Sequence, residues 1–420
     1  MILNVKAREV LDSRGNPTIE CELKTKKGLF TAMVPSGASK GRHEAVELRD
    51  NDLSRYNGKG VLKACSNINT IINKAIKGMD ESDQAAIDTA MIELDATENK
   101  SRLGANAILS VSMAASRAAA AGNNQELYEY IKELSKSKKK ALPIPSLNII
   151  NGGAHAGNEL GIQEFMIYPN KAESFKEAMR VSCETYQELK SLLIKNHGLS
   201  AINVGDEGGF APQIKDASEA LSLINQSLKN KGFQEIIKIN LDAAANEMLC
   251  SNNYNINFKS KNALLMNPEE MLKYYEELAN NNPIFSIEDP YAEDDWKSFS
   301  MITKKMKNLQ IVGDDLLVTN PLRIKKAIET RACNCLLLKI NQIGTITESI
   351  KSAKLAMNND MRVMVSHRSG ETSDDYIADF AVGIGASQIK SGAPNRSERL
   401  SKYNRLMKIE ELSGFKFGGL

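Results

Sequence analysis

Between residues 236 and 390 the sequence repeats one pattern six times: IKINLD (237–242), IFSIE (284–288), QIVGD (310–314), LLLK (336–339), VMVSH (363–367) and QIK (388–390). Each run is a short apolar segment, typical of a buried strand, that ends on a charged or metal-capable residue. The end residues are 46, 26, 25, 28 and 23 positions apart, and most of these intervals fit one strand, one helix and two short loops. The pattern predicts consecutive βα units of a parallel barrel, whose strand ends converge on one pocket.

Two more strands are expected before this ladder, SLNII (146–150) and QEFMIYP (163–169). Only the glycine-rich segment 151–162 separates them, so we expect an antiparallel hairpin rather than a crossover. Helical patterns at about 174–196 and 217–230 complete the sequence up to the ladder. The predicted fold is therefore α/β: an eight-stranded TIM-like barrel of ββαα(βα)6 order, with an antiparallel second strand.

The N-terminal part has a different organisation. Residues 1–34 alternate apolar and polar side chains between turn residues, which predicts a three-stranded antiparallel sheet. Helical patterns follow at about 60–77, 82–97 and 105–121, and Gly122 is expected to be the C-cap of the last helix. Strands followed by helices, without alternation, indicate a small α+β domain.

The segment SKSKKKALPIP (135–145) is charged and then broken by two prolines, so we expect the domain boundary there. The predicted division is an α+β N-terminal capping domain at 1–137 and the barrel catalytic domain at 138–420.

The charge balance argues against polyanionic partners. The chain has 54 basic and 52 acidic residues and a net charge of +2, so we expect no nucleic-acid partner. No stretch has the length of a membrane span, and the N-terminus lacks the pattern of a signal peptide. The six cysteines are scattered, as expected for free thiols in a reducing compartment. These features predict a cytoplasmic protein.

Asp242, Glu288 and Asp314 end three successive strands of the ladder. Three carboxylates in one pocket repel each other strongly unless a cation lies between them. Their all-oxygen donor set favours a hard ion, Mg²⁺ first and Mn²⁺ as a substitute. Helix capping or a surface salt bridge would explain one such residue, but three in register favour a metal site.

Lys339, His367 and Lys390 end the next three strands, so a cationic wall is expected opposite the acidic one. An anionic ligand that bridges the metal and this wall would account for both. Strands seven and eight of such barrels often hold a phosphate. Arg368 and Ser369 offer a guanidinium fork and a hydroxyl at that place.

Three glycine-rich loops are expected around the pocket: SGASKGRH (36–43), NGGAHAGN (151–158) and GDEGGFAP (205–212). They do not contain the phosphate-binding GxxxxGK[ST] pattern. Mobile lids of this kind suit a reaction that must exclude water.

Together these motifs resemble the enolase family, and the resemblance extends from DSRGNPT (12–18) to RSERLSKYNRL (396–406). The most specific stretches are VPSGASKG, NGGAHAGN, QEFMIYP, VGDEGGFAP, SIEDPYAEDDW, VGDDLLVTNP, LLLKINQIG, VSHRSGET and IKSGAPNRSER. The resemblance implies a glycolytic lyase, a phosphopyruvate hydratase that converts 2-phosphoglycerate to phosphoenolpyruvate with Mg²⁺.

The resemblance also implies roles for individual residues. Lys339 would be the base that removes the C2 proton, and Glu207 the acid that assists loss of the C3 hydroxyl. The first Mg²⁺ would be held by Asp242, Glu288 and Asp314, and a second by Ser39 with substrate oxygens. The residues expected to contact substrate are His155, Gln163, Glu164, His367, Arg368, Ser369 and Lys390.

The resemblance further implies a homodimer or higher homo-oligomer. The chain departs from the usual family pattern at Lys40, Asn246, Ser387 and Ser391, which affects expectations for loop kinetics and affinity rather than for the reaction. Two alternatives remain open from the residues: an enzyme of the same superfamily acting on another carboxylate, and a secondary role in surface binding.

Overall fold

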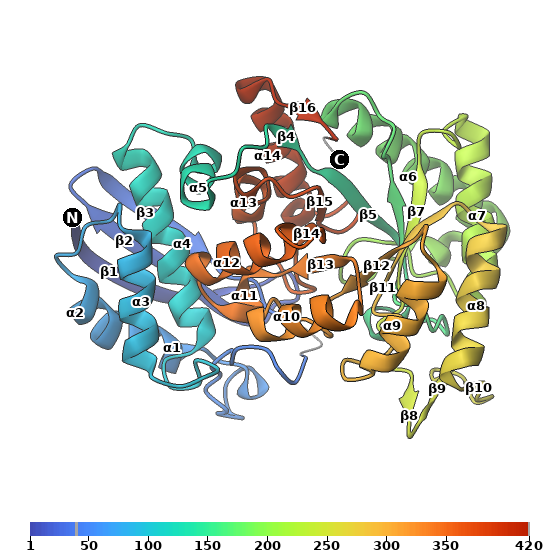
Figure 1. Ribbon diagram of the computed structural model, residues 1–420, viewed down its shortest axis with the longest axis horizontal. Helices are drawn as coiled ribbons and strands as arrows, with labels where there is room; N and C mark the ends of the chain where they lie inside the picture. Colours follow the sequence, from blue (N-terminus) through green and yellow to red (C-terminus); the bar gives the residue numbers. More distant parts are fainter. Residues whose placement is uncertain (38–40, 419–420) are drawn as a thin grey trace.

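The computed structural model describes residues 1–37 and 41–418, and within this range it consists of a barrel and a smaller N-terminal domain beside it (Figure 1). Ser39 and Lys40, named above, lie outside the described residues. None of the described helices combines the length and the apolar content needed to cross a membrane.

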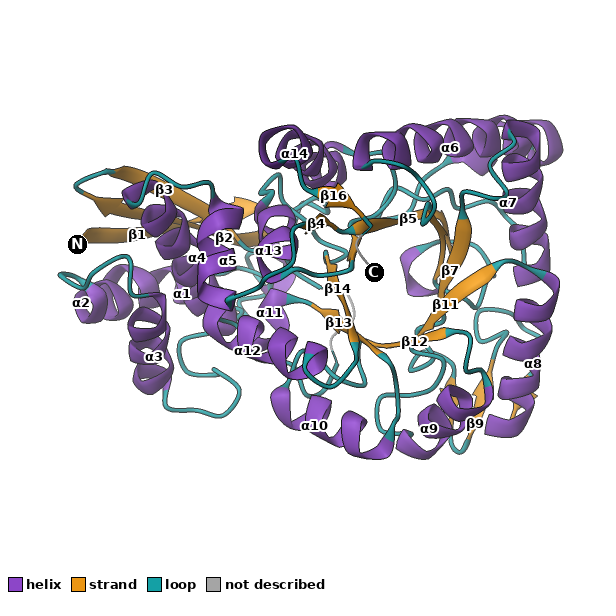
Figure 2. Ribbon diagram, turned by 45° about the horizontal axis from the view of Figure 1, so that its top comes forward, coloured by secondary structure: helices purple, strands orange, loops and turns teal. Residues whose placement is uncertain are grey.

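Eight strands close the barrel, which Figure 2 views with its ring of strands open to the reader. They are β5 (Ile144–Asn151), β6 (Glu164–Tyr168), β7 (Lys238–Asp242), β11 (Ile284–Glu288), β12 (Gln310–Gly313), β13 (Cys335–Leu338), β14 (Arg362–Ser366) and β15 (Gln388–Lys390). Strand β6 is antiparallel to both neighbours, and all other neighbouring pairs are parallel. The predicted barrel with an antiparallel second strand is confirmed.

Helices cover the outside of this ring in Figure 2. They are α6 (Phe175–His197), α7 (Ala217–Lys231), α8 (Pro268–Asn281), α9 (Trp296–Lys305), α10 (Pro321–Thr330), α11 (Ile340–Ile343), α12 (Ile346–Met357), α13 (Tyr376–Ile384) and α14 (Ser397–Ser413). Several begin at the expected N-caps: Ser174, Asn267 and Thr345 each accept a backbone N–H of the first turn through their side chains. These caps explain why the helices begin where the sequence pattern indicates.

The layer below the pocket contains both apolar and polar side chains. Val312, Leu337 and Met364 are buried in one small cluster with Cys335. Val312 and Leu337 stand two residues before Asp314 and Lys339, so by the alternation of strands they face the same side. By the same alternation, Asn240 and Gln388 stand buried below Asp242 and Lys390, so the charged residues rest on a mixed layer.

The N-terminal domain contains the predicted antiparallel sheet, β1 (Ile2–Leu11), β2 (Pro17–Thr25) and β3 (Gly28–Met33). Its helical segments are α1 (Leu62–Ser66), the π-helical η2 (Asn67–Ile72), α2 (Asn73–Ile76), α3 (Gln84–Asp95), α4 (Ala105–Gly122) and α5 (Leu127–Ser135). Helix α4 is buried on almost every face because its many alanines allow the sheet to approach closely.

Two expectations for this domain need correction. Gly122 is the last residue of α4 and not its C-cap; the cap is Asn123, whose φ of −90° does not require glycine. Helix α5 was not predicted, although Glu126 and Glu129 form a capping box at its start. The chain between α5 and β5 holds only the short strand β4 (Ala141–Leu142), and the division at residues 137/138 stays a prediction.

A buried contact, here called the joint, connects the two domains. Arg117 of α4 donates from both terminal nitrogens to the two carboxylate oxygens of Asp374, at 2.7 and 2.8 Å. Asp374 also accepts the backbone N–H groups of Met33 and Tyr376. Every oxygen of this buried carboxylate is therefore paired.

The segment after β7 forms a small antiparallel sheet that was not predicted. It contains β8 (Leu249–Cys250), β9 (Asn253–Asn255) and β10 (Leu265–Met266). Just beyond β9, Lys259 donates to the carbonyls of Gly153 and Ala156, at 2.5 and 2.6 Å. This sheet therefore supports the glycine-rich loop that carries His155.

Candidate active site

The register of the barrel gathers four carboxylates at one end. Glu164 on β6 pairs with Asp242 on β7, which in turn pairs with Glu288 on β11. Asp314 follows β12 directly, two residues after Val312, the partner of Glu288. The predicted acidic residues therefore meet at the same ends of neighbouring strands.

Lys390, at the end of β15, contacts three of these acids across the barrel. Its Nζ is 3.1 Å from Asp242 Oδ2, 3.0 Å from Glu288 Oε1 and 3.1 Å from Glu164 Oε1. One ammonium does not satisfy all three: burial and the neighbouring acids raise the pKa of Glu164 and of Glu288 well above the usual range. One oxygen of Glu164 is buried without a hydrogen-bond partner.

Lys339, at the end of β13, forms an ion pair with Asp314. Burial is the largest influence on the pKa of Lys339 and lowers it, but Asp314 and Glu288 oppose burial and the net shift is upward. In this arrangement Lys339 is protonated. It can accept a proton only after its contact with Asp314 is relieved.

The donor set fits a divalent cation. Asp242, Glu288 and Asp314 supply hard oxygen ligands, and the pocket has more carboxylates than ammonium groups, as the raised pKa values show. Two groups of acidic or imidazole side chains among the described residues are close enough to share an ion, His155–Glu164–Glu207 and Asp289–Asp314–Asp315. Of the three predicted ligands, only Asp314 belongs to either group. The acidic groups could hold a metal, whereas the ligand set Asp242, Glu288 and Asp314 stays a prediction.

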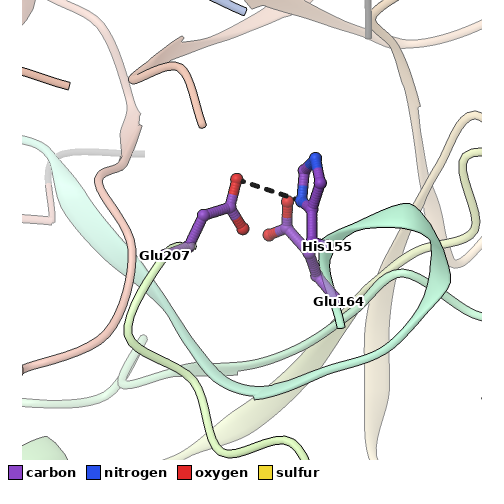
Figure 3. A group of neighbouring side chains, drawn as sticks. All are labelled: His155, Glu164 and Glu207. Carbon is purple, nitrogen blue, oxygen red and sulfur yellow. Dashed lines mark ion pairs between the residues drawn. The ribbon is translucent and has the colours of Figure 1, made fainter. Parts of the chain in front are cut away.

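A group of three titratable side chains, His155, Glu164 and Glu207, lies beside these acids and is shown in Figure 3. His155 Nδ1 lies 3.4 Å from Glu207 Oε1, with Glu164 beside them. Burial is the largest influence on the pKa of Glu207 and would raise it, but His155, His367 and Lys390 together hold that pKa well below its usual range. Burial would lower the pKa of His155, but Glu207 raises it overall. The environment thus favours the protonated forms of Glu164 and His155 and the ionised form of Glu207.

Arg368 and Ser369 follow β14 and line the pocket with His367. The Arg368 guanidinium donates to Glu44 at 2.8 and 3.2 Å and to Asn341 at 3.1 Å. Glu44 belongs to the N-terminal domain and directly follows the glycine-rich loop at 36–43. A carboxylate from one domain thus contacts the guanidinium expected to bind an anion in the other.

The enclosed cavity at these residues is about 30 Å³. Its lining includes His155, Gln163, Glu164, Glu207, Asp242, Asp314, Lys339, His367, Arg368, Ser369 and Lys390. Glu288 does not line it but contacts it through Lys390. A larger hollow of about 820 Å³ lies between α7, α8 and the sheet β8–β10, and it contains none of the predicted site residues.

Two contributors were not predicted from the sequence. Glu44 could have been noticed as the acid directly after the first glycine-rich loop. Arg399, within RSER, is buried and contacts His367, although an arginine in the first turn of a helix gives no signal of burial. Among the departures from the family pattern, Asn246 bonds to Asp315 and to the N–H of Glu293, and the Ser391 hydroxyl is buried without a partner.

Comparison with known proteins gives consistent results along the whole chain. A family model described as "Enolase, N-terminal domain" matches residues 2–131, and one described as "Enolase, C-terminal TIM barrel domain" matches residues 139–417. A curated protein named Enolase B, from Dictyostelium discoideum, is 53% identical over 418 residues, covering 98% of this chain and 94% of that protein. Another, named Enolase, from Mastigamoeba balamuthi, is 52% identical over 421 residues, covering 98% and 96%.

Proposed function

The chain belongs to the enolase family and is a phosphopyruvate hydratase, and from this premise we propose that its barrel pocket dehydrates 2-phosphoglycerate reversibly to phosphoenolpyruvate in glycolysis, with Mg²⁺. The observation that supports this most is the charge arrangement of the pocket. The acids of β6, β7 and β11 share one ammonium group, that of Lys390, while Lys339 and Arg368 line the same cavity. A bound Mg²⁺ would supply further positive charge for these acids, and the cationic side chains would bind the anionic groups of the substrate.

Asp242, Glu288 and Asp314 would hold one Mg²⁺, and Ser39, outside the described residues, would join substrate oxygens at a second. Three carboxylates and one Mg²⁺ sum to −1, and a second Mg²⁺ changes the sum to +1, which suits a substrate of charge about −3. When bound, the metal neutralises the substrate carboxylate, which gains charge when the C2 proton leaves.

Lys339 Nζ accepts the proton as the C2–H bond breaks. Asp314 raises the pKa of Lys339 in the present arrangement. For Lys339 to act as a base, the Asp314 carboxylate must be paired with another positive charge. As a metal ligand Asp314 would be paired in this way, and the neighbouring charge of Lys390 then favours the neutral amine.

Glu207 donates the proton with which the C3 hydroxyl leaves as water, and the electron pair from the C2–H bond becomes the C2=C3 double bond. Glu207 is ionised in the described arrangement, so it must first be protonated. His155 Nδ1, 3.4 Å away and with a raised pKa, is placed to supply that proton.

Arg368 and Ser369 would bind the phosphate, with His155, Gln163, Glu164, His367 and Lys390 completing the contacts to substrate. To bind a phosphate, Arg368 exchanges its contact with Glu44 for one with the ligand. Loop closure from the N-terminal domain can therefore be coupled to occupancy of the pocket.

We further propose a cytoplasmic homodimer. All six cysteines are free, in agreement with a reducing compartment. The dimer rests on family membership, and light scattering at micromolar concentration tests it: the mass of a monomer would contradict the proposal.

A direct assay for phosphoenolpyruvate from 2-phosphoglycerate tests the reaction. We expect turnover to stop after exhaustive treatment with EDTA and to return when Mg²⁺ is added. Asp314→Asn should raise the Mg²⁺ concentration needed for half-maximal activity. Full turnover by the chelated protein would contradict the metal assignment, and absence of turnover at any Mg²⁺ concentration would contradict the reaction.

A further inference from the structure

Arg399 lies in the first turn of α14 and its side chain is fully buried. Both terminal nitrogens point to pocket segments rather than to an acid. They donate to the carbonyls of Arg368 and Ser369 at 2.7 Å, to the carbonyl of Asp206 at 3.0 Å, and to His367 Nδ1 at 2.5 Å. The acid nearest to this guanidinium, Glu398, lies 3.6 Å from Nε.

The contact with His367 fixes the protonation of that ring. A guanidinium has only donors, so His367 Nδ1 must accept and carries no proton. The neutral ring then has its proton on Nε2, which lies 3.8 Å from Glu207 Oε1. Burial lowers the pKa of His367 well below its usual range despite Glu207, and Arg399 lowers it further. His367 is therefore a neutral donor that faces Glu207.

The same guanidinium also fixes the position of Glu207. Its acceptor Asp206 directly precedes Glu207, and the carbonyl of Glu207 accepts the N–H of Ala393 at 2.9 Å. Gly392 adopts a φ of +79°, and a Cβ there would lie 2.8 Å from Arg399 Cδ and 2.7 Å from the Glu207 carbonyl. The backbone is thus shaped to let Arg399 pass beside Glu207.

We propose that Arg399 is a positioning residue. It holds His367 as the tautomer protonated on Nε2. It also fixes the backbone next to Glu207 relative to the backbone next to His367. In the opposite tautomer, Nε2 would present a lone pair to Glu207. That lone pair would accept the proton that Glu207 must deliver to the C3 hydroxyl. The kinetic consequence rests on the proposed function, whereas the tautomer does not.

The tautomer is measured through the ring-nitrogen chemical shifts of the four histidines in ¹⁵N-labelled protein, with His367→Gln to assign the signal. In the wild type we expect a neutral His367 with its proton on Nε2 from about pH 6 to 8. A proton on Nδ1, or a doubly protonated ring at neutral pH, overturns the proposal. Because this reading needs no change at Arg399, it decides the tautomer even if Arg399 variants do not fold.

Arg399→Met should release the ring, so that the second tautomer appears and the His367 pKa moves toward its ordinary value of about 6.5. Arg405→Met is the matched control, because Arg405 lies on the same helix but binds Asp379 and Glu126. The control should lose stability and keep the tautomer. Equal shifts of the ring signals in both variants would overturn the proposal.

In kinetics, Arg399→Met should lower formation of phosphoenolpyruvate by about 10²-fold, the scale of losing a general acid, and spare exchange of the C2 hydrogen with deuterated water. Arg399→Lys, which keeps a donor, should recover part of the rate. Loss of exchange together with turnover would contradict a role through Glu207. An inactive wild type would refute the proposed function and leave the tautomer reading intact.

Discussion

The pocket and the joint both bury charged side chains, but they bury them in opposite proportions. In the joint, one guanidinium meets the buried carboxylate of Asp374 and the exposed carboxylate of Asp375. Burial would raise the pKa of Asp374, but Arg117 and two backbone N–H groups oppose burial and the net shift is downward. In the pocket, Lys390 alone contacts three carboxylates, and the pKa values of Glu164 and Glu288 rise. Balanced charges stabilise the fold, whereas unbalanced charges prepare a binding site for a cation.

The largest expected effects come from the pocket. Lys339→Ala should abolish both turnover and exchange of the C2 hydrogen with deuterated water, because the base is lost. Glu207→Gln should spare exchange while turnover falls by roughly 10²-fold or more. Asp374→Asn, in the joint, is the control and should leave exchange per folded molecule unchanged. Equal loss of exchange in the two pocket variants would contradict the assignment of base and acid.

The free energy of unfolding should be more sensitive to loss of a carboxylate in the joint than to loss of one in the pocket. Asp374→Asn should lower the free energy of unfolding by about 1.5–3 kcal/mol, because Arg117 loses a charged hydrogen-bond partner. Glu288→Gln removes one of the crowded acids, so in the presence of EDTA it should leave stability unchanged or raise it. Urea unfolding measures both. If both variants lost similar stability, the difference in charge balance between the two regions would have no energetic meaning.

The pH dependence of the free energy of unfolding should also differ between the joint and the pocket. The folded pKa of Asp374 is lowered, so its contribution is present above its unfolded pKa of about 3.9 and is lost as pH falls through the folded value. Asp374→Asn should therefore flatten the loss of stability below about pH 4. Glu288 has a raised pKa and the opposite sign, so Glu288→Gln should remove a loss of stability that appears as pH rises above about 4.3. Unfolding in urea at several pH values, with EDTA present, tests both slopes.

The smallest expected effect concerns the loop that carries His155. Lys259→Met removes the donor to Gly153 and Ala156, so amide exchange in residues 153–158 should accelerate about 10-fold, the equivalent of roughly one hydrogen bond. Lys261→Met, at an exposed position two residues on, is the control. Global stability should be nearly unchanged in both variants. Equal exchange in the two variants would show that the loop is held by other contacts.

The sequence predicted the barrel well because each strand ends on a residue whose chemistry interrupts an apolar run. The antiparallel β6 was predicted for a simple reason: the segment after β5 has no helical pattern. The same logic located Asp242, Glu288 and Asp314, since strand ends in such a barrel share one face.

What the sequence did not reveal depends on contacts between distant segments. Glu44 reaches Arg368 across 324 positions, and Arg399 reaches Asp206 across 193. Neither residue stands in a local pattern that marks it as buried. The opposite pKa shifts of Glu164 and Glu207 likewise depend on burial and on which charged groups surround each acid in the folded chain. The sheet β8–β10 consists of strands too short to leave a periodic signal.

The closing pair of the barrel also constrains how the molecule can be synthesised. Strand β5 pairs with β15, whose residues follow those of β5 by 244 positions, as in the pair Ile144 and Gln388. At about 5–20 residues per second, translation needs roughly 12–50 seconds between these strands. Throughout that interval the edge of β5 that pairs with β15 has unpaired backbone N–H and C=O groups on the nascent chain. The N-terminal sheet, whose strands are neighbours in sequence, can form at once, so chaperone dependence on the ribosome should be confined to the barrel.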